Sequence, residues 1–597
     1  MQDERRYFLN VERSVLDRPW VDRLDLAAMR AATAMSQRTG LSEIVARILA
    51  ARGVDIDGAE GFLSPAIRDL MPDPSTMTGM DALADRLARA IVDGEHVGLF
   101  GDYDVDGACS CALMTRYFDA MGVKADCHIP DRIFEGYGPN IAAMDKLIDA
   151  GATLIVTLDC GTTSREPIAH ARERGADVLV IDHHLSDAEL PPALSLVNPN
   201  RPDDVSGLGY LCAAGVTFMA LVATNRVLRA KGIGPQPDLL QMLDLVALAT
   251  VCDVVPLKGL NRAFVTRGIE IMRQGRNSGI SALALAARIN GPINPYHLGF
   301  LIGPRINAGG RIGDAALGMR LLSTNSEHDA IAIATQLDEL NAERQRIEAD
   351  AVEMAVAAAE AEIGGGEGPP VLVMASEEWH PGVVGLVAAR LRERFERPAF
   401  AIALGRNGLG TGSGRSMPGV DLGAAVIAAV DEHVIVKGGG HAMAAGITLQ
   451  TAQIGPFRAF MSQRLGEAVS AARARSTLGI DAAMTARGAS VDFVREIERA
   501  GPFGSGNPTP IFAFPSHRVR HAEVVGKGGH VRFSLSSDDG ARLKGIAFKA
   551  AATQLGAALI DARDGRPLHV AGTLGLDHWQ GRETVQLRAI DAAIPAL

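Results

Sequence analysis

The chain has 597 residues, 47% of them hydrophobic and 22% charged, which is the composition of a globular protein of about two to four domains. Its net charge of −11 excludes a wholly basic surface, so any site for a polyanion is a local patch. The sequence carries no signal peptide and no apolar run of membrane-spanning length, and its six cysteines form no CxxC pair, so we expect a protein of the reducing cytoplasm without a membrane.

The first predicted elements are helices. Between Leu41 and Arg52 apolar residues recur at a helical spacing, and prolines at 65, 72 and 74 interrupt the pattern that follows. We therefore expect residues 1–75 to form a helical lead-in without catalytic residues.

The segment 99–107 carries three carboxylates, on Asp102, Asp104 and Asp106, directly after an apolar run. The run predicts a buried strand, followed by a turn into a helix over 107–121. Carboxylates at the carboxyl end of a strand lie where open α/β sheets bind ligands, and like charges so close together repel one another unless a cation neutralises them. The segment therefore indicates a metal site.

Two other interpretations of this segment have to be weighed. A calcium EF-hand loop also begins Asp-x-Asp-x-Asp-Gly, but its twelfth position, counted from Asp102, is Leu113, where that loop requires a bidentate glutamate. A solvated acidic turn without function is the second alternative, and only the rest of the chain can decide against it.

Two further strands end in residues that can bind metal. The strand predicted over 153–158 is followed by Asp159, and the strand predicted over 177–181 is followed by Asp-His-His over 182–184. Such alternation of strands and helices is typical of βαβ units in a parallel sheet, whose carboxyl ends meet at one edge. We therefore expect these side chains to form one site. The intervening helices are predicted over 140–150 and 164–174.

Another carboxylate follows the apolar helix predicted over 239–251. Asp253 stands just after this helix, before Val-Val-Pro256. It either caps the segment that follows or joins the metal site, and we favour a ligand because the other acidic ends lie in the same compact domain.

The longest helix is predicted over 326–362, with a capping box formed by Thr324 and Glu327 at its start. One of its faces is apolar and the other charged, as in a solvated helix that bridges two domains. The glycines and prolines of 364–370 then mark a domain boundary.

Residues 371–470 form a second α/β unit. Two glycine-rich stretches, 410–416 and 438–446, are predicted to be loops whose backbone N–H groups approach phosphate oxygens, although simple turns are the alternative. Ser413, Arg415 and His441 would add side-chain donors. The other elements predicted here are strands over 371–374 and 399–404 and a helix over 382–394.

Residues 471–597 contain several short alternating segments between glycine and aspartate turns, which predicts a small β-barrel. Basic side chains and one aromatic ring could form a groove for a single strand, although ordinary solvated strand faces are the alternative. The strands include 530–535, 543–548 and 583–588. The groove residues would be Arg518, Arg520, Lys527, Arg532, Lys544 and Trp579.

The motifs in this order resemble those of the DHH phosphoesterase superfamily, and the resemblance covers nearly the whole chain. The residues that carry this resemblance are 102–107, 158–161, 182–184, Asp253 in Cys-Asp-Val-Val-Pro, and the glycine-rich stretch 438–441. Within the superfamily the chain resembles the RecJ family, the single-strand-specific 5′→3′ DNA exonucleases of bacteria. The stretches that carry this narrower resemblance are 303–311, 412–416 and 501–512. One departure is Gly309-Gly310, where Ala-Gly is commoner.

The resemblance implies two metal ions that share Asp159. One would be bound by Asp102, Asp104 and Asp159, and the other by Asp106, Asp159, His183 and Asp253. Such a mixed carboxylate and imidazole set suits Mn²⁺, with Mg²⁺ as a possible substitute. The catalytic candidates are Asp159, Asp182, which would orient a neighbouring histidine, and His184, which would contact the scissile phosphate.

The resemblance also implies a set of side chains that bind the terminal and scissile phosphates. They are Arg132, Arg305, Asn307, Ser413, Arg415 and His441. For Arg305 an interdomain salt bridge is the alternative. Capture of a terminal 5′-phosphate would make the enzyme an exonuclease, and a narrow channel between the two α/β domains would exclude duplex DNA.

We therefore expect a bacterial, cytoplasmic, single-stranded-DNA-specific 5′→3′ exonuclease that releases 5′-mononucleotides and acts in DNA repair and recombination. Its expected partners are single-stranded DNA with a 5′ end, a single-strand-binding protein and a repair helicase, and we expect a monomer. The alternatives are a DHH phosphodiesterase of short oligonucleotides or cyclic dinucleotides, a pyrophosphatase, and a catalytically silent DNA-binding scaffold.

The expected fold is a multidomain α/β protein. A parallel-sheet DHH domain is joined by a long helix to a smaller α/β DHH-associated domain, and a C-terminal OB-fold β-barrel follows. The expected boundaries are 1–75 for the lead-in, 76–325 for the catalytic domain, 326–365 for the connecting helix and linker, 366–470 for the DHH-associated domain and 471–597 for the barrel.

Overall fold

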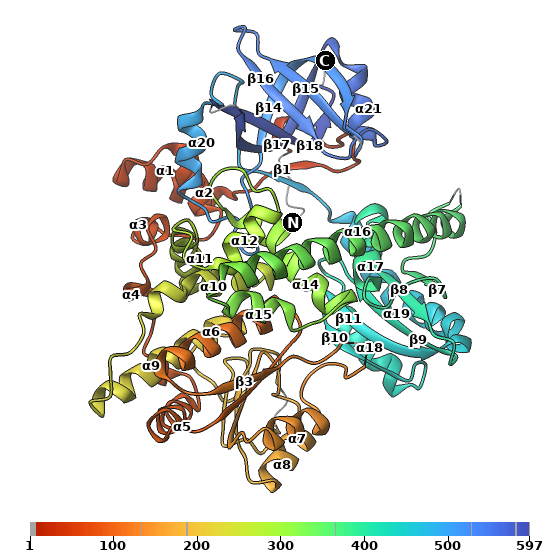
Figure 1. Cartoon of the computed structure of the whole chain (residues 1–597). Coiled ribbons are helices and arrows are strands. Elements are labelled where there is room, and N and C mark those ends of the chain that lie inside the picture. The colour runs from red at the N-terminus through yellow and green to blue at the C-terminus, as the bar shows by residue number, and fades with distance from the viewer. Residues whose placement is uncertain are drawn as a thin grey trace.

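The structure, a computed structural model, describes residues 7–132, 134–186, 189–364, 366–526, 528–579 and 582–595 (Figure 1). A parallel-sheet region and a β-barrel lie at opposite ends of the molecule, and the long helix α16 (Glu327–Ile363) crosses between them toward a second five-stranded sheet. None of the helices in these ranges combines the length and the hydropathy that a membrane crossing requires.

The first sheet is parallel, as the alternation of strands and helices predicted, with strand order β3-β2-β4-β5-β6. Neighbouring residues in a strand face opposite sides. Leu99 thus packs with helices α5, α6 and α9, whereas Phe100 packs with α7 and α8. The elements are α5 (Met80–Asp93), β2 (Val97–Gly101), α6 (Val105–Met121), β3 (Ala125–His128), α7 (Ile141–Asp149), β4 (Leu154–Leu158), α8 (Arg165–Glu173), β5 (Asp177–Ile181), β6 (Ser195–Val197) and α9 (Ala213–Ala230).

A layer of helices connects this sheet to α16. The helix predicted over 239–251 begins with a 3₁₀ turn, and its α-helical part ends at Cys252, next to Asp253. The elements are η3 (Leu239–Met242), α10 (Leu243–Cys252), α11 (Gly259–Met272), α12 (Ser278–Ala286), α13 (Pro295–His297), the π-helical η4 (Leu298–Ile302), α14 (Gly303–Ile312) and α15 (Leu317–Ser323).

Helix α16 is as long as predicted, but its capping residue differs. Ser326 is the N-cap, and its hydroxyl accepts a hydrogen bond from the Asp329 backbone N–H. The Thr324 hydroxyl accepts one from the Ser326 N–H instead. The expected capping box at Thr324 is therefore wrong, because the helix begins at Glu327, which makes Ser326 and not Thr324 the residue directly before its first turn.

The second sheet, of order β10-β11-β9-β8-β7, corrects the prediction for the glycine-rich stretches. Most of both stretches lies in strands β9, β10 and β11, and not in phosphate-binding loops. The reason is packing, since a Cβ at Gly414 would lie 2.4 Å from the Phe400 ring. The elements are β7 (Leu372–Ser376), α17 (Val384–Phe395), β8 (Ala399–Leu404), β9 (Leu409–Arg415), α18 (Leu422–Asp431), β10 (Lys437–His441), β11 (Ala444–Gln450), η5 (Thr451–Gln453) and α19 (Ile454–Ala474).

The C-terminal region is the predicted barrel. Strands β14, β15, β16, β18 and β17 pair in this order, and pairing of β17 with β14 closes the ring. Of the expected groove residues, Arg532 pairs with Glu523, while Lys527 and the Trp579 side chain lie outside the described residues. The elements are β12 (Leu478–Ile480), β13 (Ala482–Ala483), α20 (Val491–Glu498), β14 (Phe512–Val525), β15 (His530–Ser536), β16 (Arg542–Ala547), α21 (Gln554–Asp561), β17 (Asp564–Trp579) and β18 (Arg582–Ala593).

The N-terminal segment is largely helical, as predicted, and it packs against this barrel. Strand β1 pairs with β12 in parallel, and Met35 and Ile48 belong to the same buried cluster as Phe514 and Val570 of the barrel. The two ends of the chain thus share one core. The N-terminal elements are η1 (Phe8–Asn10), β1 (Trp20–Asp22), α1 (Leu26–Thr39), α2 (Glu43–Ala50), α3 (Ala59–Leu63), α4 (Ile67–Leu70) and η2 (Pro74–Thr76).

The buried Asp481 carboxylate connects these two ends, and its loss should be costly. It accepts hydrogen bonds from Arg23 Nε at 3.1 Å and Ile511 N–H at 2.9 Å, and Arg52 Nη1 lies 3.5 Å away. We expect Asp481→Ala to lower the free energy of unfolding by about 3–5 kcal/mol, because it leaves the largely buried Arg52 guanidinium and the partly buried Arg23 guanidinium without their carboxylate. Urea denaturation measures this change. Asp57→Ala, which removes an exposed ion pair of the same region, should leave the midpoint unchanged.

Candidate metal centre

The acidic segment after β2 is shaped by the start of α6. Asp104 is the N-cap of this helix, and its carboxylate accepts hydrogen bonds from the N–H groups of Asp106 at 2.9 Å and Gly107 at 3.1 Å. A Cβ at Gly107 would lie 2.4 Å from the Asp102 carbonyl oxygen, so glycine allows the tight turn. The turn brings the carboxylates of Asp102 and Asp106 to the same sheet edge.

Asp106 is held by the N-terminus of a second helix. Its two carboxylate oxygens accept hydrogen bonds from the Ala213 N–H at 2.6 Å and the Ala214 N–H at 2.8 Å, at the start of α9. The side chain is 1% exposed. The free N–H groups and the positive end of the helix dipole favour a carboxylate at this position.

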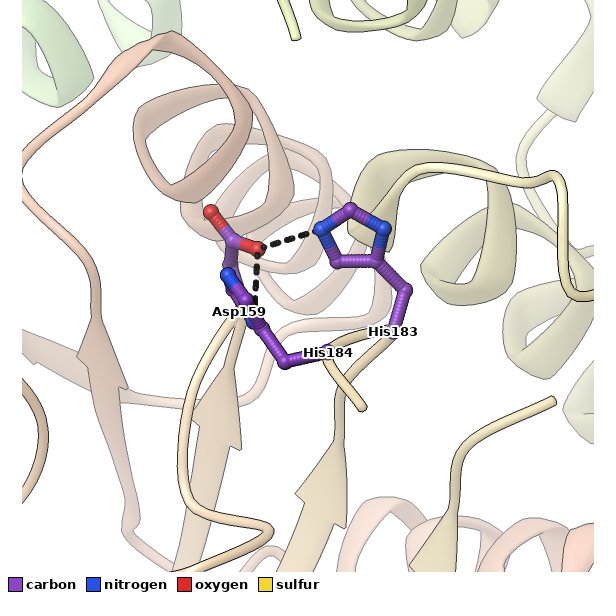
Figure 2. A group of neighbouring side chains, drawn as sticks. All are labelled: Asp159, His183 and His184. Atoms are coloured by element: carbon purple, nitrogen blue, oxygen red, sulfur yellow. Dashed lines mark ion pairs between the residues drawn. The ribbon is translucent and has the colours of Figure 1, made fainter. Parts of the chain in front are cut away.

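Asp159 and His183 meet at the ends of β4 and β5 (Figure 2). Asp159 Oδ1 lies 3.3 Å from His183 Nε2 and 3.9 Å from His184 Nδ1. His183 Nδ1 donates to the Leu211 carbonyl at 3.2 Å, which leaves Nε2 as the ring nitrogen that faces the acidic groups. Nε2 also lies 3.7 Å from Asp253 Oδ2 and 3.8 Å from Asp106 Oδ2.

The structure thus brings all six predicted metal ligands together in groups whose donor atoms lie within 4.8 Å of one another. The groups are Asp102, Asp104 and Asp159; Asp106, His183 and Asp253; and Asp159, His183 and His184. Asp159 is common to two of them. Two buried oxygens, Asp159 Oδ1 and Asp253 Oδ2, have no hydrogen-bond partner among the described residues.

The electrostatics of these groups fit a cation. Burial, together with the charges of neighbouring carboxylates, raises the pKa of Asp102, Asp159 and Asp253, the last to about 9. Several neighbouring carboxylates that are buried or partly buried cannot all be charged without a counter-ion. Oxygen and imidazole donors directed at one point are the ligand set of divalent manganese or magnesium, so the residues present fit the metal that the sequence implied.

Asp182 fixes the position of His184. Its Oδ1 lies 2.8 Å from His184 Nδ1 and accepts hydrogen bonds from the backbone N–H groups of both histidines, and its Oδ2 accepts one from Thr162. Burial would raise the pKa of Asp182, but the hydrogen bonds from His184 and Thr162 and the nearby histidine charges lower it. Burial would likewise lower the pKa of His184, yet Asp182 and two other carboxylates raise it to about 9.

Three residues that sequence reasoning did not select also shape this site. The Tyr137 hydroxyl lies 3.2 Å from His184 Nδ1 and donates to the Asp159 carbonyl at 3.4 Å. Asn198 and Asn200 donate to the backbone carbonyls of His184 and His183, respectively. The sequence signal for the two asparagines is weak, because only their place just after the short strand β6 marks them.

The residues predicted to bind phosphate fall into two sets, and three of them lie close to other members of this group. Arg132 lies over the Tyr103 ring at 5.1 Å, and Arg415 donates to the Ser413 hydroxyl at 2.7 Å. Burial and the positive charges of Arg132, Arg344 and Arg415 lower the pKa of Arg311 to about 10. Arg311 thus joins Arg132 and Arg415 in a cationic group that the sequence analysis did not identify as functional.

The second set of candidates for phosphate binding comprises Arg305, Asn307 and His441. Arg305 forms an ion pair with Asp338 of α16 at 2.8 Å, which is the interaction that its alternative interpretation predicted. Asn307 lines a groove of about 940 Å³ along α16, together with Arg344 of α16 and Lys549 of the barrel. His441 is exposed at the end of β10.

Comparison with known proteins agrees with this architecture. The sequence matches the DHH family, N-terminal domain, over residues 96–250, the DHHA1 domain over 368–467 and the RecJ OB domain over 480–591. It is 34% identical to the single-stranded-DNA-specific exonuclease RecJ of Salmonella typhimurium over 521 residues, which is 85% of this chain and 89% of that protein.

Solved structures give the same result. RecJ from Thermus thermophilus in complex with Mn²⁺ superposes with a TM-score of 0.77 at 28% identity, over 97% of this chain and 79% of that chain. The complex of RecJ from the same organism with Mg²⁺ has a TM-score of 0.72 at 26% identity, over 97% of this chain and 78% of that chain.

Proposed function

The chain belongs to the RecJ family, and we propose that it is a metal-dependent, single-stranded-DNA-specific 5′→3′ exonuclease that releases 5′-mononucleotides. The observation that carries this proposal is the convergence of six carboxylate and imidazole side chains, from three strand ends and one helix end, into two donor groups, with Asp159 of one group 3.3 Å from His183 of the other. A scaffold that only binds DNA would not need buried carboxylates without hydrogen-bond partners.

The two donor groups would hold two cations, preferably Mn²⁺, with Mg²⁺ as a substitute. Asp102, Asp104 and Asp159 would bind one, and Asp106, His183 and Asp253 the other, with Asp159, which lies beside His183, as a ligand to both. Such a pair of cations activates a water molecule and stabilises both oxygens of an in-line displacement at phosphorus. The buried carboxylates of this chain supply the negative charge that keeps the cations in place.

His184 is the residue best placed to act on the substrate directly. Asp182 holds its ring through Nδ1 and favours its protonated form, in which Nε2 can donate to a scissile phosphate oxygen. A fixed imidazolium stabilises the charge that develops on the phosphate, or it protonates the leaving oxygen. Tyr137 limits rotation of this ring by its contact with Nδ1.

The cationic group of Arg132, Arg311 and Arg415 would bind the terminal and scissile phosphates, with Ser413, Asn307 and His441 as additional donors. Mutual repulsion among these arginines is relieved when an anion binds between them. Recognition of a terminal 5′-phosphate would make hydrolysis start at that end. Arg305 can contribute only if its ion pair with Asp338 opens.

The groove along α16 favours a long substrate over a dinucleotide. It lies between α14, α16 and α17 and reaches Lys549 of the barrel, so it extends from the end of the catalytic region past the DHHA1 domain to the RecJ OB domain. Basic side chains lining such a path would follow a phosphate backbone. A phosphodiesterase of short oligonucleotides or cyclic dinucleotides has no use for this groove, and hydrolysis of a dinucleotide at the rate of a long single strand would favour that alternative.

We further propose that the chain acts as a monomer in bacterial DNA repair and recombination, with a single-strand-binding protein and a helicase as partners. The proposed domains are the sequence-based ones, 76–325, 366–470 and 471–597, with residues 1–75 as lead-in and 326–365 as connection. The matched family regions lie within the first, second and third of these ranges.

The direct test uses the purified chain with Mn²⁺ and DNA labelled at either end. We expect a 5′-labelled single strand to release labelled mononucleotide at once, a 3′-labelled strand to shorten progressively, and blunt duplex DNA to resist. Chelation with EDTA should stop the reaction and added Mn²⁺ should restore it, because the carboxylate groups need a cation to act. Undiminished hydrolysis in EDTA, or release from the 3′ end first, would contradict the proposal.

A further inference from the structure

The turn formed by residues 501–507 leads into the barrel and lies against the segment just after Asp253. The proposed function gives no role to this glycine-rich motif. We propose that the turn keeps the Asp253 carboxylate directed at the metal-binding group, so that the C-terminal region supports the hydrolytic site itself. The inference rests on the proposed function and deepens it.

The contact between the turn and the segment is close. The Leu257 N–H donates to the Ser505 carbonyl at 2.8 Å, and Leu257 is 2% exposed. A Cβ at Gly504 would lie 2.8 Å from Leu257 Cδ1, and a Cβ at Gly506 would lie 2.9 Å from Pro256 Cβ. Glycine at both positions therefore allows this packing without displacement of the segment.

The segment needs such support because its backbone is strained. Val254, directly after Asp253, has a φ of +61°, which is costly for a β-branched residue, and its side chain is 67% exposed. The packing of the Val254 side chain therefore does not enforce this backbone conformation. Asp253 Oδ2 has no hydrogen-bond partner in the described parts of the chain, so the direction of this carboxylate depends on the backbone.

The turn itself is rigid. Gly504 and Asn507 exchange backbone hydrogen bonds of 2.9 and 3.2 Å. The Asn507 side chain is buried, donates to the carbonyls of Ala500 and Pro502, and accepts from Arg52 of the N-terminal segment. A turn fixed in this way can hold the segment at 254–258 against its strain.

Arg262 of α11 fastens the turn to the catalytic domain. This buried guanidinium donates from Nε to the Phe62 carbonyl at 2.8 Å and from Nη2 to the Gly501 carbonyl, and it stacks 3.8 Å from the Phe62 ring centre. One side chain thus joins α11, the N-terminal helix α3 and the turn. Asp253 lies nine positions before Arg262 in the sequence.

The test compares two glycines that share a positive φ. Gly506 has φ of +69° and touches Pro256, whereas Gly540, in a barrel hairpin, has φ of +79° and a Cβ placed on it would meet no atom within 4 Å. We expect Gly506→Ala to weaken Mn²⁺ binding, measured by electron paramagnetic resonance on the DNA-free protein, by about tenfold. Binding of oligothymidine in EDTA should change less than about twofold, and Gly540→Ala should match the wild type in both assays.

A second variant covers the case in which Gly506→Ala does not fold. Gly504→Ala meets only the flexible end of the Leu257 side chain, and it should weaken Mn²⁺ binding by about threefold without loss of the thermal transition. The inference is overturned if the folded variants bind Mn²⁺ as Gly540→Ala does. If the wild type neither binds Mn²⁺ nor degrades single strands, the proposed function fails instead.

Discussion

Asp159→Asn is expected to lower the rate of single-strand hydrolysis by at least about 1,000-fold, because Asp159 is the carboxylate common to two donor groups. Its neighbours cannot replace it, since Asp102 and Asp104 are grouped with Asp159 but not with His183, whereas Asp106 and Asp253 are grouped with His183 but not with Asp102 and Asp104. Initial rates on a 5′-labelled single strand at saturating Mn²⁺ measure the effect.

The same substitution should stabilise the metal-free protein. Burial and neighbouring carboxylates raise the pKa of Asp159 in the folded state, so its ionisation above the unfolded pKa opposes folding. In EDTA we expect Asp159→Asn to raise the melting temperature at pH 8, and the gain to shrink as the pH falls toward 4. Mn²⁺ should then stabilise the variant much less than the wild type.

Asp126→Asn provides the matched control for this experiment. Asp126 lies in β3 of the same sheet, outside the donor groups, and its partly exposed carboxylate contacts His96. This variant should retain wild-type hydrolysis and Mn²⁺ stabilisation. Retention of appreciable metal-dependent activity by Asp159→Asn would refute the proposed pair of ions.

His184→Ala and His183→Ala, changed one at a time, should separate catalysis from metal binding. His184 is held by Asp182, and its side chain is 36% exposed, so we expect its loss to lower kcat by about 100- to 1,000-fold with little change in Mn²⁺ affinity. His183 Nε2 faces three carboxylates, so its loss should weaken Mn²⁺ binding first.

Mn²⁺ titrations of both the rate and the paramagnetic signal distinguish these outcomes. Raising the Mn²⁺ concentration should restore part of the activity of His183→Ala and none of that of His184→Ala. His170→Ala, on the outer helix α8, is the control for loss of an imidazole and should behave as the wild type. Equal loss of Mn²⁺ affinity in both site variants would assign His184 to the metal instead of the phosphate.

Local sequence patterns were sufficient for the elements that carry the acidic residues. The apolar runs before Asp102, Asp159 and Asp182 predicted three strands of one sheet, and the parallel topology then required their ends to meet. The first sheet, the long helix and the barrel are confirmed. These predictions succeeded because strand periodicity and connection rules act over a few tens of residues.

Where a sequence pattern has two physical explanations, the structure was predicted less well. Glycines at 410, 412 and 414 fit either a phosphate loop or a strand packed against bulky side chains. The close approach of Ile402 to the first two and of Phe400 to Gly414 decides between them. Similarly, an arginine at 305 fits a phosphate contact or an ion pair, and the approach of Asp338 on α16 favours the ion pair. Neither the packing around these glycines nor the approach of Asp338 can be read from the local sequence.

The sequence by itself determined which carboxylate and imidazole side chains lie together at one edge of the first sheet, because each follows or begins a strand or helix that its own neighbours specify. Only the tertiary structure decided how that edge is supported. Pairing of β1 with β12, the cationic group around Arg311 and the packing of the 501–507 turn beside Asp253 all join segments far apart in the chain. Such contacts depend on packing among domains, and no local pattern encodes them.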